Sequence, residues 1–309
     1  MFVQLISRGR VMLMSGAGTV VLVAACTDTT SPTRRTPSGP QLSSPPAASA
    51  ATLVTCCNNI VFRRDSAFNP RIYTINADGT GLKKFPFSGS NPSWSPDHSK
   101  IVFQNGRIAI VNADGSGFRM LTDIDGDQSP SFTPDGQKVV FVHEAAKQSD
   151  ILTMNLDGTN RQVLLKTPTT SEWAPRFSPD GKKLAYMRTR KNVTELAVWD
   201  LAMNVHTVVA ASANQFGSES WSPDSKRLAF SAGFSSTGCT IAVVDANGAN
   251  RKNFPSGVAG CFHPTWSPDG TELAFTAGNA VFRGKVDVAA APTRITLTPN
   301  VIDHSPVWQ

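Results

Sequence analysis

The sequence predicts an all-β protein: a six-bladed β-propeller of four-stranded antiparallel blades, preceded by an export signal and a polar tether. Three observations predict this organisation. An aromatic residue followed by Ser/Thr-Pro-Asp recurs every 38 to 45 positions, the period of propeller blades. Short runs of β-favouring residues and turn residues follow each copy. The first 55 residues show no such repeat.

Residues 1–25 are predicted to be a lipoprotein signal peptide. Arg8 and Arg10 precede an apolar stretch, Val11 to Val23, that glycines interrupt and that is shorter than the about 20 residues needed to span a bilayer. Leu22-Val23-Ala24-Ala25-Cys26 resembles the lipobox of bacterial lipoproteins, which implies acylation of Cys26. The alternative is a plain signal peptide followed by an incidental cysteine.

Residues 26–55 are predicted to be the lipidated cysteine and a disordered tether, because Ser, Thr, Pro and Ala dominate and no hydrophobic periodicity is present. The formal charge of +6 falls by two, to +4, without Arg8 and Arg10. The remaining basic residues are scattered through the repeats, which argues against a nucleic-acid partner.

Residues 56–309 are predicted to form the propeller. In each Ser/Thr-Pro-Asp-Gly copy, Pro fixes its φ angle, Asp bonds local amides and Gly takes a positive φ, which makes a tight turn. Two β runs such as Ile101-Val-Phe and Ile108-Ala-Ile-Val follow, then a hairpin turn such as Asn112-Ala-Asp-Gly and a closing run. Four strands in a meander make one blade. The aromatic anchors are Trp94, Phe132, Phe177, Trp221, Trp266 and Trp308.

The two ends of the repeat region are predicted to share one blade. Ile60-Val-Phe begins at the second strand of a blade, and His304-Ser-Pro-Val-Trp-Gln ends the chain just after a first strand. The C-terminal strand should therefore join the N-terminal blade and close the ring, which leaves no open sheet edge at the seam. Loss of residues 303–309 should open it.

From about residue 60 to 309 the repeats resemble the WD40-like PD40 repeat of the TolB-like propeller family. The copies of Trp-Ser-Pro-Asp-Gly and Asn-Ala-Asp-Gly carry the resemblance. It implies a six-bladed propeller in the cell envelope. The sequence differs from the family in having no preceding α/β domain and in its lipoprotein signal.

Propeller geometry sorts the connections onto two faces. The repeated tight turns share one face, here called the turn face. The connections 63–71, 142–150, 187–195 and 231–239 and those between blades share the other, the variable-loop face, where binding sites are usually built. The alternative for each residue there is a solvated charge or an aromatic cap on a blade. The predicted binding face comprises Arg63, Arg71, Arg107, His143, Trp173, Arg188, Arg190, Phe216, Phe234, Phe262, His263 and His304.

Cys239 and Cys261 both fall in variable-face loops of adjacent blades, so we predict a disulfide between them. It would close a loop of about 22 residues and contribute about 3 kcal/mol in the chain-entropy model, and export permits oxidation. Cys56 and Cys57 would remain as an adjacent pair or as thiols. Four cysteines divided between two faces do not make a tetrahedral zinc site.

The sequence contains no Gly-x-Ser-x-Gly elbow, no His-Glu-x-x-His and no phosphate loop. Its five histidines lack ligand spacing, and Asp123-Ile-Asp-Gly-Asp lacks the later Glu of a calcium loop. We therefore expect no catalytic residue, no cofactor and no metal site.

The first functional hypothesis is a non-catalytic, monomeric, lipid-anchored envelope scaffold that engages a protein or an anionic glycan through the variable-loop face. Thr27, not Asp, follows Cys26, which by the lipoprotein resemblance implies the outer membrane, facing the periplasm or the cell surface. The alternative is a glycan-active lyase or hydrolase with His263, His304 and Asp303 at the channel mouth. Fold analogy alone supports this alternative, and clustering of the three residues in a polar pocket would favour it.

Overall fold

The structure is a computed structural model that describes residues 10–14, 20–24, 59–66, 69–145, 148–212, 216–235, 238–254, 258, 261–288, 290–297 and 301–308. The chain divides into two units, Met1–Cys57 and Asn58–Gln309. In the first, β1 (Arg10–Met14) and β2 (Val20–Ala24) pair antiparallel. No helix occurs among the described residues, and so none that is long and apolar enough to cross a membrane. Cys26, the tether, Cys56 and Cys57 lie outside the described residues, so the predictions made for them stay predictions.

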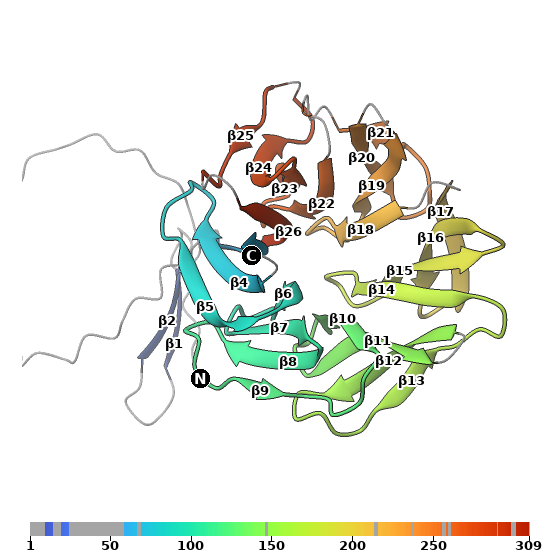
Figure 1. Ribbon diagram of the computed structural model, residues 1–309, viewed down its shortest axis with the longest axis horizontal. Helices are drawn as coiled ribbons and strands as arrows, with labels where there is room; N and C mark the ends of the chain where they lie inside the picture. The colour runs from blue at the N-terminus through green and yellow to red at the C-terminus, as the bar shows by residue number, and fades with distance from the viewer. Residues whose placement is uncertain are drawn as a thin grey trace, which may run out of the picture. The chain divides into compact units, whose positions relative to one another are not determined.

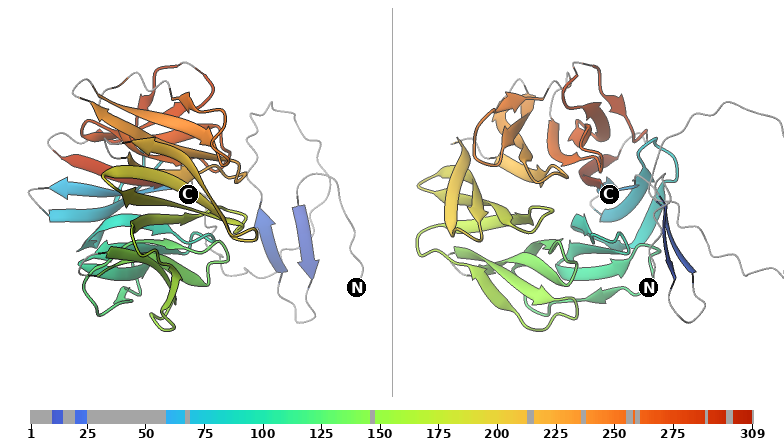
Figure 2. Two further views of the ribbon diagram at one scale, coloured as in Figure 1. Left: turned by 90° about the vertical axis from the view of Figure 1, so that its right-hand side faces the viewer. Right: turned by 180° about the vertical axis from the view of Figure 1, so that it is seen from behind.

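In the second unit the described residues form six four-stranded antiparallel sheets around a central axis (Figures 1 and 2), which confirms the predicted propeller. In chain order the strands are β3 (Asn59–Ser66), β4 (Asn69–Asn76), β5 (Lys83–Ser88), β6 (Ser90–Trp94), β7 (Lys100–Asn105), β8 (Arg107–Asn112), β9 (Arg119–Met120), β10 (Asp127–Phe132), β11 (Lys138–Ala145), β12 (Gln148–Asn155), β13 (Gln162–Leu165), β14 (Ser171–Phe177), β15 (Lys183–Arg190), β16 (Val193–Asp200), β17 (Val205–Ser212), β18 (Phe216–Trp221), β19 (Arg227–Ser235), β20 (Gly238–Asp245), β21 (Lys252–Asn253), β22 (Cys261–Trp266), β23 (Glu272–Ala277), β24 (Ala280–Lys285), β25 (Thr293–Arg294) and β26 (Ile302–Trp308).

The predicted closure of the ring is confirmed. β26 pairs antiparallel with β3, so that Trp308 lies opposite Ile60 and the sheet order is β26-β3-β4-β5. A buried ion pair joins the same two strands: Arg64 donates Nε to Asp303 Oδ1 at 2.5 Å and Nη2 to Asp303 Oδ2 at 2.9 Å. The seam therefore combines backbone pairing with a buried charge pair.

Both predicted turn types are present. In the first, Gly181 donates its N–H to the carbonyl of Ser178 at 2.8 Å and takes a φ of +70°. In the second, Gly115 donates to the carbonyl of Asn112 at 2.8 Å with a φ of +91°. A left-handed backbone conformation is easiest for glycine, which explains its place in the repeat.

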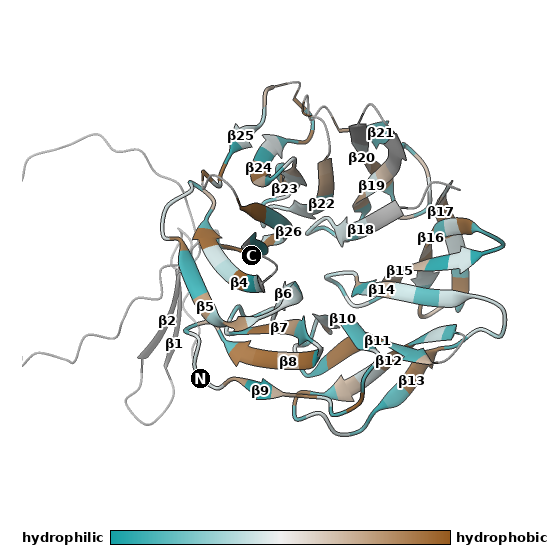
Figure 3. Ribbon diagram, in the orientation of Figure 1, coloured by the Kyte–Doolittle hydropathy of each residue, from teal (hydrophilic) through white to brown (hydrophobic). Residues whose placement is uncertain are grey.

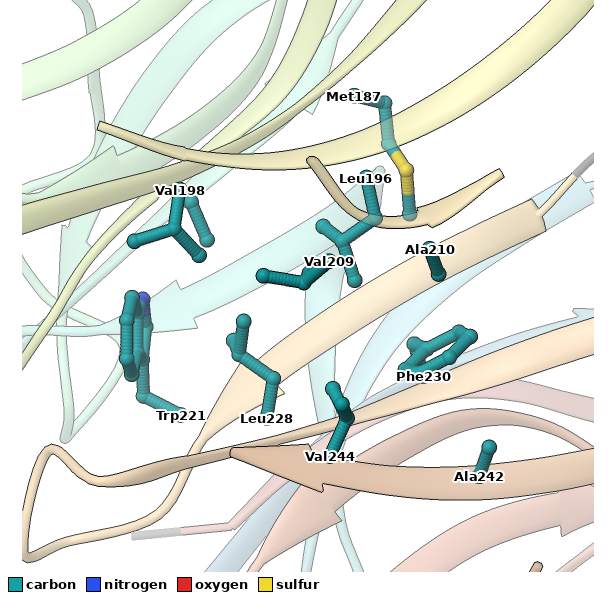
Figure 4. Close-up of a cluster of buried hydrophobic side chains, with 11 residues drawn as sticks. Met187, Leu196, Val198, Val209, Ala210, Trp221, Leu228, Phe230, Ala242 and Val244 are labelled. Atoms are coloured by element: carbon teal, nitrogen blue, oxygen red, sulfur yellow. The ribbon is translucent and has the colours of Figure 1, made fainter. Parts of the chain in front are cut away.

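The hydrophobic core lies between neighbouring blades. In the cluster of Figure 4, Leu196 and Val198 of β16 pack with Leu228 and Phe230 of β19, and Trp221 of β18 joins them. Figure 3 shows the middle strand β8 as largely hydrophobic, whereas the outer strand β9 begins hydrophilic at Arg119. The interior of β8, from Ile108 to Val111, is accordingly buried.

The six inner strands β6, β10, β14, β18, β22 and β26 each contain a β-bulge. The residue after the bulged position is Pro in five strands and Glu219 in β18. Since Pro cannot donate to a sheet ladder, a bulge is where an inner strand tolerates it. The bulged residues, all with positive φ, are Asn91 (+49°), Ser129 (+52°), Ala174 (+51°), Ser218 (+45°), His263 (+53°) and Ser305 (+50°).

Candidate functional site: the variable-loop face and the central cavity

The structure separates the connections onto the two expected faces. On the variable-loop face, a connection between blades touches a hairpin tip, as where Glu144 donates its N–H to the carbonyl of Gly126 at 2.8 Å. On the turn face, equivalent turns of neighbouring blades touch, as where the N–H of Asp180 donates to Ser225 Oγ at 3.0 Å.

The hairpins of the variable-loop face are longer, and their loops shorter, than predicted. The expected connection 187–195 is mostly strand, because Arg188 pairs with Glu195 and Thr189 with Thr194 across β15 and β16. Cys239 and Cys261 likewise lie in β20 and β22 and not in loops. Polar residues at an exposed hairpin tip look like loop residues in a sequence, whereas the backbone ladder continues through them.

Cys261 is buried at the start of β22. The side chain of Cys239 lies outside the described residues, so the disulfide stays a prediction.

The residues predicted for the binding face lie on strands that reach the variable-loop face. The side chains of Phe216 and Phe234 lie outside the described residues. The strand positions are Arg63 on β3, Arg71 on β4, Arg107 on β8, His143 on β11, Trp173 on β14, Arg188 and Arg190 on β15, Phe216 on β18, Phe234 on β19, Phe262 and His263 on β22, and His304 on β26.

Most of the predicted cations hold a partner within the chain, and only Arg190 among them is both exposed and without an ion pair in the described part of the chain. The face therefore carries less free positive charge than its composition implies. These contacts include Arg63 Nε to Asp65 Oδ1 at 2.7 Å, Arg107 Nε to Asp125 Oδ1 at 2.8 Å, His143 Nδ1 to Asp127 Oδ1 at 2.8 Å and Arg188 Nε to Glu195 Oε2 at 2.6 Å. Arg71 donates Nη1 to the carbonyl of Pro86.

A cavity of about 170 Å³ lies at the axis, where inner strands from five blades contribute its walls. Two charged residues in it break the repeat. Glu219 of β18 occupies the position that is Pro in the other five blades. Arg176 of β14 occupies the next position, which is Ser93, Ser131 or Ser220 in three other blades.

Arg176 and Glu219 form no contact ion pair with each other. Glu219 is 5% exposed, and neither of its carboxylate oxygens has a hydrogen-bond partner. Arg176 donates Nη1 to the carbonyl of Pro175 at 2.9 Å and forms no ion pair in the described part of the chain. Burial raises the pKa of Glu219 to about 8, although the charge of Arg176 acts in the opposite direction.

His263 lines the same cavity, and its Nδ1 is buried without a hydrogen-bond partner. Burial, together with His304 and Arg63, lowers the pKa of His263 to about 4. Its ring lies 6.5 Å from that of His304 at an angle of 77°.

The predicted cluster of His263, His304 and Asp303 is only partly formed, because Asp303 is turned to Arg64 and it is Asp65 that lies 3.7 Å from His304 Nε2. No group of three or more His, Cys, Asp or Glu side chains within the described ranges could hold a metal ion.

Sequence reasoning missed Arg176 and Glu219 as site residues. A signal for both was present, since each departs from the consensus of the repeat at an aligned position. A larger cavity of about 510 Å³, lined by β20, β21 and the segment after β24, contains mixed charges such as Arg227 and Asp287, 3.8 Å apart. None of its lining side chains has a buried unpaired polar atom, so the central cavity is the stronger candidate.

Comparison with known proteins gives a family and a set of similar folds. The PD40 family, described as the TolB beta propeller domain, matches residues 48–172 and 147–308. No curated protein sequence matches the chain.

Among solved structures, TolB from Acinetobacter baumannii is similar with a TM-score of 0.69 at 18% identity, over 81% of this chain and 66% of that chain. A putative TolB from Agrobacterium tumefaciens has a TM-score of 0.63 at 16% identity, over 77% and 88%. An oligogalacturonate lyase from Vibrio parahaemolyticus has a TM-score of 0.53 at 14% identity, over 79% and 73%. The chain thus spans just under two thirds of the first of these, and at these identities the likeness is one of fold.

Proposed function

We propose, from the premise that this chain belongs to the PD40 family of TolB beta propeller domains, that it is a non-catalytic binding or scaffold protein of the cell envelope. The observation that carries this function is the closed ring with dissimilar hairpin tips on one face. Closure of β26 onto β3 completes the frame, while the hairpins that reach this face differ in strand length, from six residues in β7 to nine in β19, and in composition. Variable connections on a rigid frame are suited to binding.

The partner that fits this face is a protein or an anionic glycan. Trp173 and Phe262 are half-buried at the face and offer apolar contact area, and Arg190 offers an unpaired charge. Aromatic and arginine side chains are the residue types that most often dominate binding energy at interfaces. Ion pairs on the same face, such as Arg63 with Asp65, keep the surface around these residues polar.

The proposed location is the outer membrane, with the chain exported and anchored through Cys26. The lipobox-like sequence supports this, because two or three acyl chains hold a protein durably on a membrane. Replacing Cys26 with Ser should move the protein from the membrane fraction to the soluble fraction and abolish incorporation of a labelled fatty acid. Membrane retention of the variant would contradict lipid anchoring.

The binding function is tested by capture from detergent-solubilised envelope. The parent chain is compared with a variant in which the tips 189–194 and 234–239 are replaced by Gly-Ser turns. The matched single variants are Arg190→Ser on the variable-loop face and Lys182→Ser on the turn face, both at exposed cations. We expect the parent and Lys182→Ser to recover the same protein or glycan, the tip variant to recover none and Arg190→Ser to recover less. Equal capture by the tip variant would exclude the variable-loop face as the binding site.

A polyuronate lyase or hydrolase is the second candidate, and the contact between His263 and His304 is the observation that favours it. With its pKa lowered to about 4, His263 is neutral at pH 7 but is a weaker base than an ordinary histidine. Incubation with oligogalacturonate, followed by detection of unsaturated or shortened products, tests this chemistry. Turnover that His263→Gln abolishes would replace the binding function, whereas the scaffold function predicts no product.

A further inference from the structure

The propeller does not need the charges of Arg176 and Glu219. Five blades close with Pro at the position of Glu219, and no other blade has a charged residue at the position of Arg176. A buried charge is unfavourable by several kcal/mol unless it is paired and hydrogen-bonded. Both residues line the cavity on the axis. Their presence in neighbouring strands is therefore a feature of the cavity and not of the fold.

Several buried carboxylates elsewhere in the described ring hold a cation, whereas the wholly buried Glu172 accepts from Thr167 and Thr170 and leaves Oε2 unpaired. Asp303 holds Arg64, and the wholly buried Asp127 holds both Arg161 and His143. The central cavity, in contrast, has three buried acceptors without a hydrogen-bond partner in the described part of the chain, which are Glu219 Oε1, Glu219 Oε2 and His263 Nδ1. It also has the guanidinium of Arg176, which forms no contact ion pair in the described part of the chain, although the charge of Glu219 acts on it.

This set of groups is complementary to a zwitterion. An ammonium group carries three N–H donors, which matches three unpaired acceptors. A carboxylate accepts from a guanidinium in a strong, charge-assisted hydrogen bond. A simple amine would leave Arg176 unpaired, and a simple organic acid would leave Glu219 unpaired. An α-amino acid carries both groups on one carbon and adds no net charge to the site.

We propose that the central cavity binds a free α-amino acid, with Glu219 and His263 accepting from its ammonium group and Arg176 donating to its carboxylate. The cavity, at about 170 Å³, is several times the about 30 Å³ that a water molecule occupies in the liquid. Its size favours the smaller amino acids. Occupancy of this cavity does not depend on the partner proposed for the variable-loop face.

The protonation states agree with this ligand. Burial raises the pKa of Glu219 to about 8, so the carboxyl group is largely protonated at neutral pH, and an incoming ammonium charge would cause it to ionise. Binding below pH 8 should therefore release a proton and should strengthen as the pH rises toward 8. His263, whose pKa is lowered to about 4, is neutral in this range and accepts at Nδ1 when Nε2 carries its proton. The charged or titratable groups that act on these two residues are Arg176, His304 and Arg63.

The full chain is titrated with glycine, L-alanine and L-serine, and separately with acetate and methylamine, each at on the order of 10 mM. Thermal unfolding and calorimetry in buffers of different ionisation enthalpy are the readouts. We expect at least one amino acid to raise the unfolding midpoint by about 3 °C and to release a proton at pH 7. Acetate and methylamine, which carry one group each, should give no shift.

Variants assign the site. Glu219→Gln keeps the shape of the side chain, and Arg176→Ser introduces the residue that three other blades carry, so both are compatible with the fold. Each should weaken binding at least tenfold, while Glu144→Gln, at an exposed position on β11, should not.

Three results would overturn the assignment, and two of them need no variant. No shift with any amino acid would mean that only water fills the cavity, and equal binding of acetate would mean an anion site. Unchanged binding by a folded Glu219→Gln variant would place the amino acid elsewhere.

Discussion

In each described Ser/Thr-Pro-Asp turn, which joins the first and second strands of a blade, one residue has a left-handed backbone conformation. In two of these turns that residue is not glycine. Gly136, Gly181 and Gly270 take φ values of +68° to +71°, whereas His98 takes +58° and Ser225 takes +62°. An L-residue in this region is less stable than glycine by about 1–2 kcal/mol. The turn between β6 and β7 and the turn between β18 and β19 therefore store strain that the three turns with glycine avoid.

Replacing His98 with Gly should stabilise the protein. Relief of the left-handed conformation outweighs the greater flexibility that glycine gives the unfolded chain, for a net gain of about 0.5–1 kcal/mol in the free energy of unfolding. The matched control is Gly181→Ala, which should lose about 1 kcal/mol, because its new Cβ would lie 3.8 Å from Pro134, an ordinary contact, and only the backbone is affected. Urea unfolding measures both. Loss of stability in His98→Gly would show that its side chain contributes more than the strain.

Glu219 should make stability depend on pH between about 5 and 8. Its pKa is raised from 4.5 to about 8, so in this interval the native state holds a proton that the unfolded chain has released. Stability from this group is present below pH 4.5 and falls as the pH rises, by at most about 1.4 kcal/mol per pH unit. Glu219→Gln cannot ionise. It should match the parent near pH 5 and exceed it by up to about 4 kcal/mol at pH 8.

Urea unfolding at pH 5, 6.5 and 8 measures the difference in free energy of unfolding between Glu219→Gln and the parent. The other titrating groups contribute equally to both proteins and therefore cancel. Glu195→Gln provides the control, because Glu195 is a partly exposed partner of Arg188 at a hairpin tip. A constant difference between Glu219→Gln and the parent at all three pH values would show that Glu219 is ionised in the native state.

Strands and turns are the elements that the sequence predicts best. Turn chemistry is local: Ser178, Asp180 and Gly181 specify one turn whatever surrounds them, and the apolar runs between turns have no alternative partner. The hairpin tips are predicted less well, since Arg188 and Glu195 look like loop residues until their cross-strand pairing is known. The bulges follow from Pro within a strand, but their positive φ values do not.

The site residues depend on contacts that no local pattern encodes. Asp303 was expected at the channel mouth, yet it is buried against Arg64 on a strand 239 positions away. Arg176 and Glu219 lie 43 positions apart and have meaning only once the ring brings β14 and β18 together. Aligning the blades reveals both departures from the repeat, but only the three-dimensional arrangement shows that the two charges face one cavity without pairing.

Removing one partner of the ion pair between Arg64 and Asp303 should destabilise the protein more than removing both. Asp303→Asn leaves a guanidinium that is 5% exposed without its counter-charge, which should lower the free energy of unfolding by about 3–5 kcal/mol. The double variant Arg64→Met with Asp303→Leu should recover much of that loss, because it removes both buried charges. Chemical unfolding measures the free energy of unfolding of the parent, the single variant and the double variant. Asp125→Asn, in the exposed pair with Arg107, should change stability by less than about 1 kcal/mol and serves as the control.

At the scale of the whole molecule, the residues that repeat from blade to blade build the frame, whereas the residues that differ between blades are the candidates for function. The repeated turns, the Pro residues of the inner strands and the aromatic anchors recur in nearly every blade, and they build a frame. The exceptions, Arg176, Glu219 and His263, gather at the axis, and the dissimilar hairpin tips gather on one face. A ring of similar blades holds these exceptions in fixed positions only as long as it stays closed.

Deletion of residues 303–309 should therefore destabilise the whole second unit and not only one blade. The deletion removes the pairing partner of β3, the carboxylate of Asp303 and the anchor Trp308, which is 7% exposed. Loss of one buried Trp side chain alone is expected to remove about 3–5 kcal/mol, a large part of the 5–15 kcal/mol that stabilises a typical domain. The unpaired edge of β3 would in addition be exposed to other chains.

Size-exclusion chromatography and urea unfolding of the truncated chain measure this effect, with deletion of Gln309 alone as the control. We expect the truncated chain to aggregate or to lose its cooperative transition, and a synthetic peptide of residues 301–309 to restore part of both by adding the missing strand in trans. A truncated chain that unfolds at the same urea concentration as the parent would mean that the blades are stable without closure. The axial cavity would then lose the wall formed by Ser305, Pro306 and Val307 and keep the walls from the other four blades.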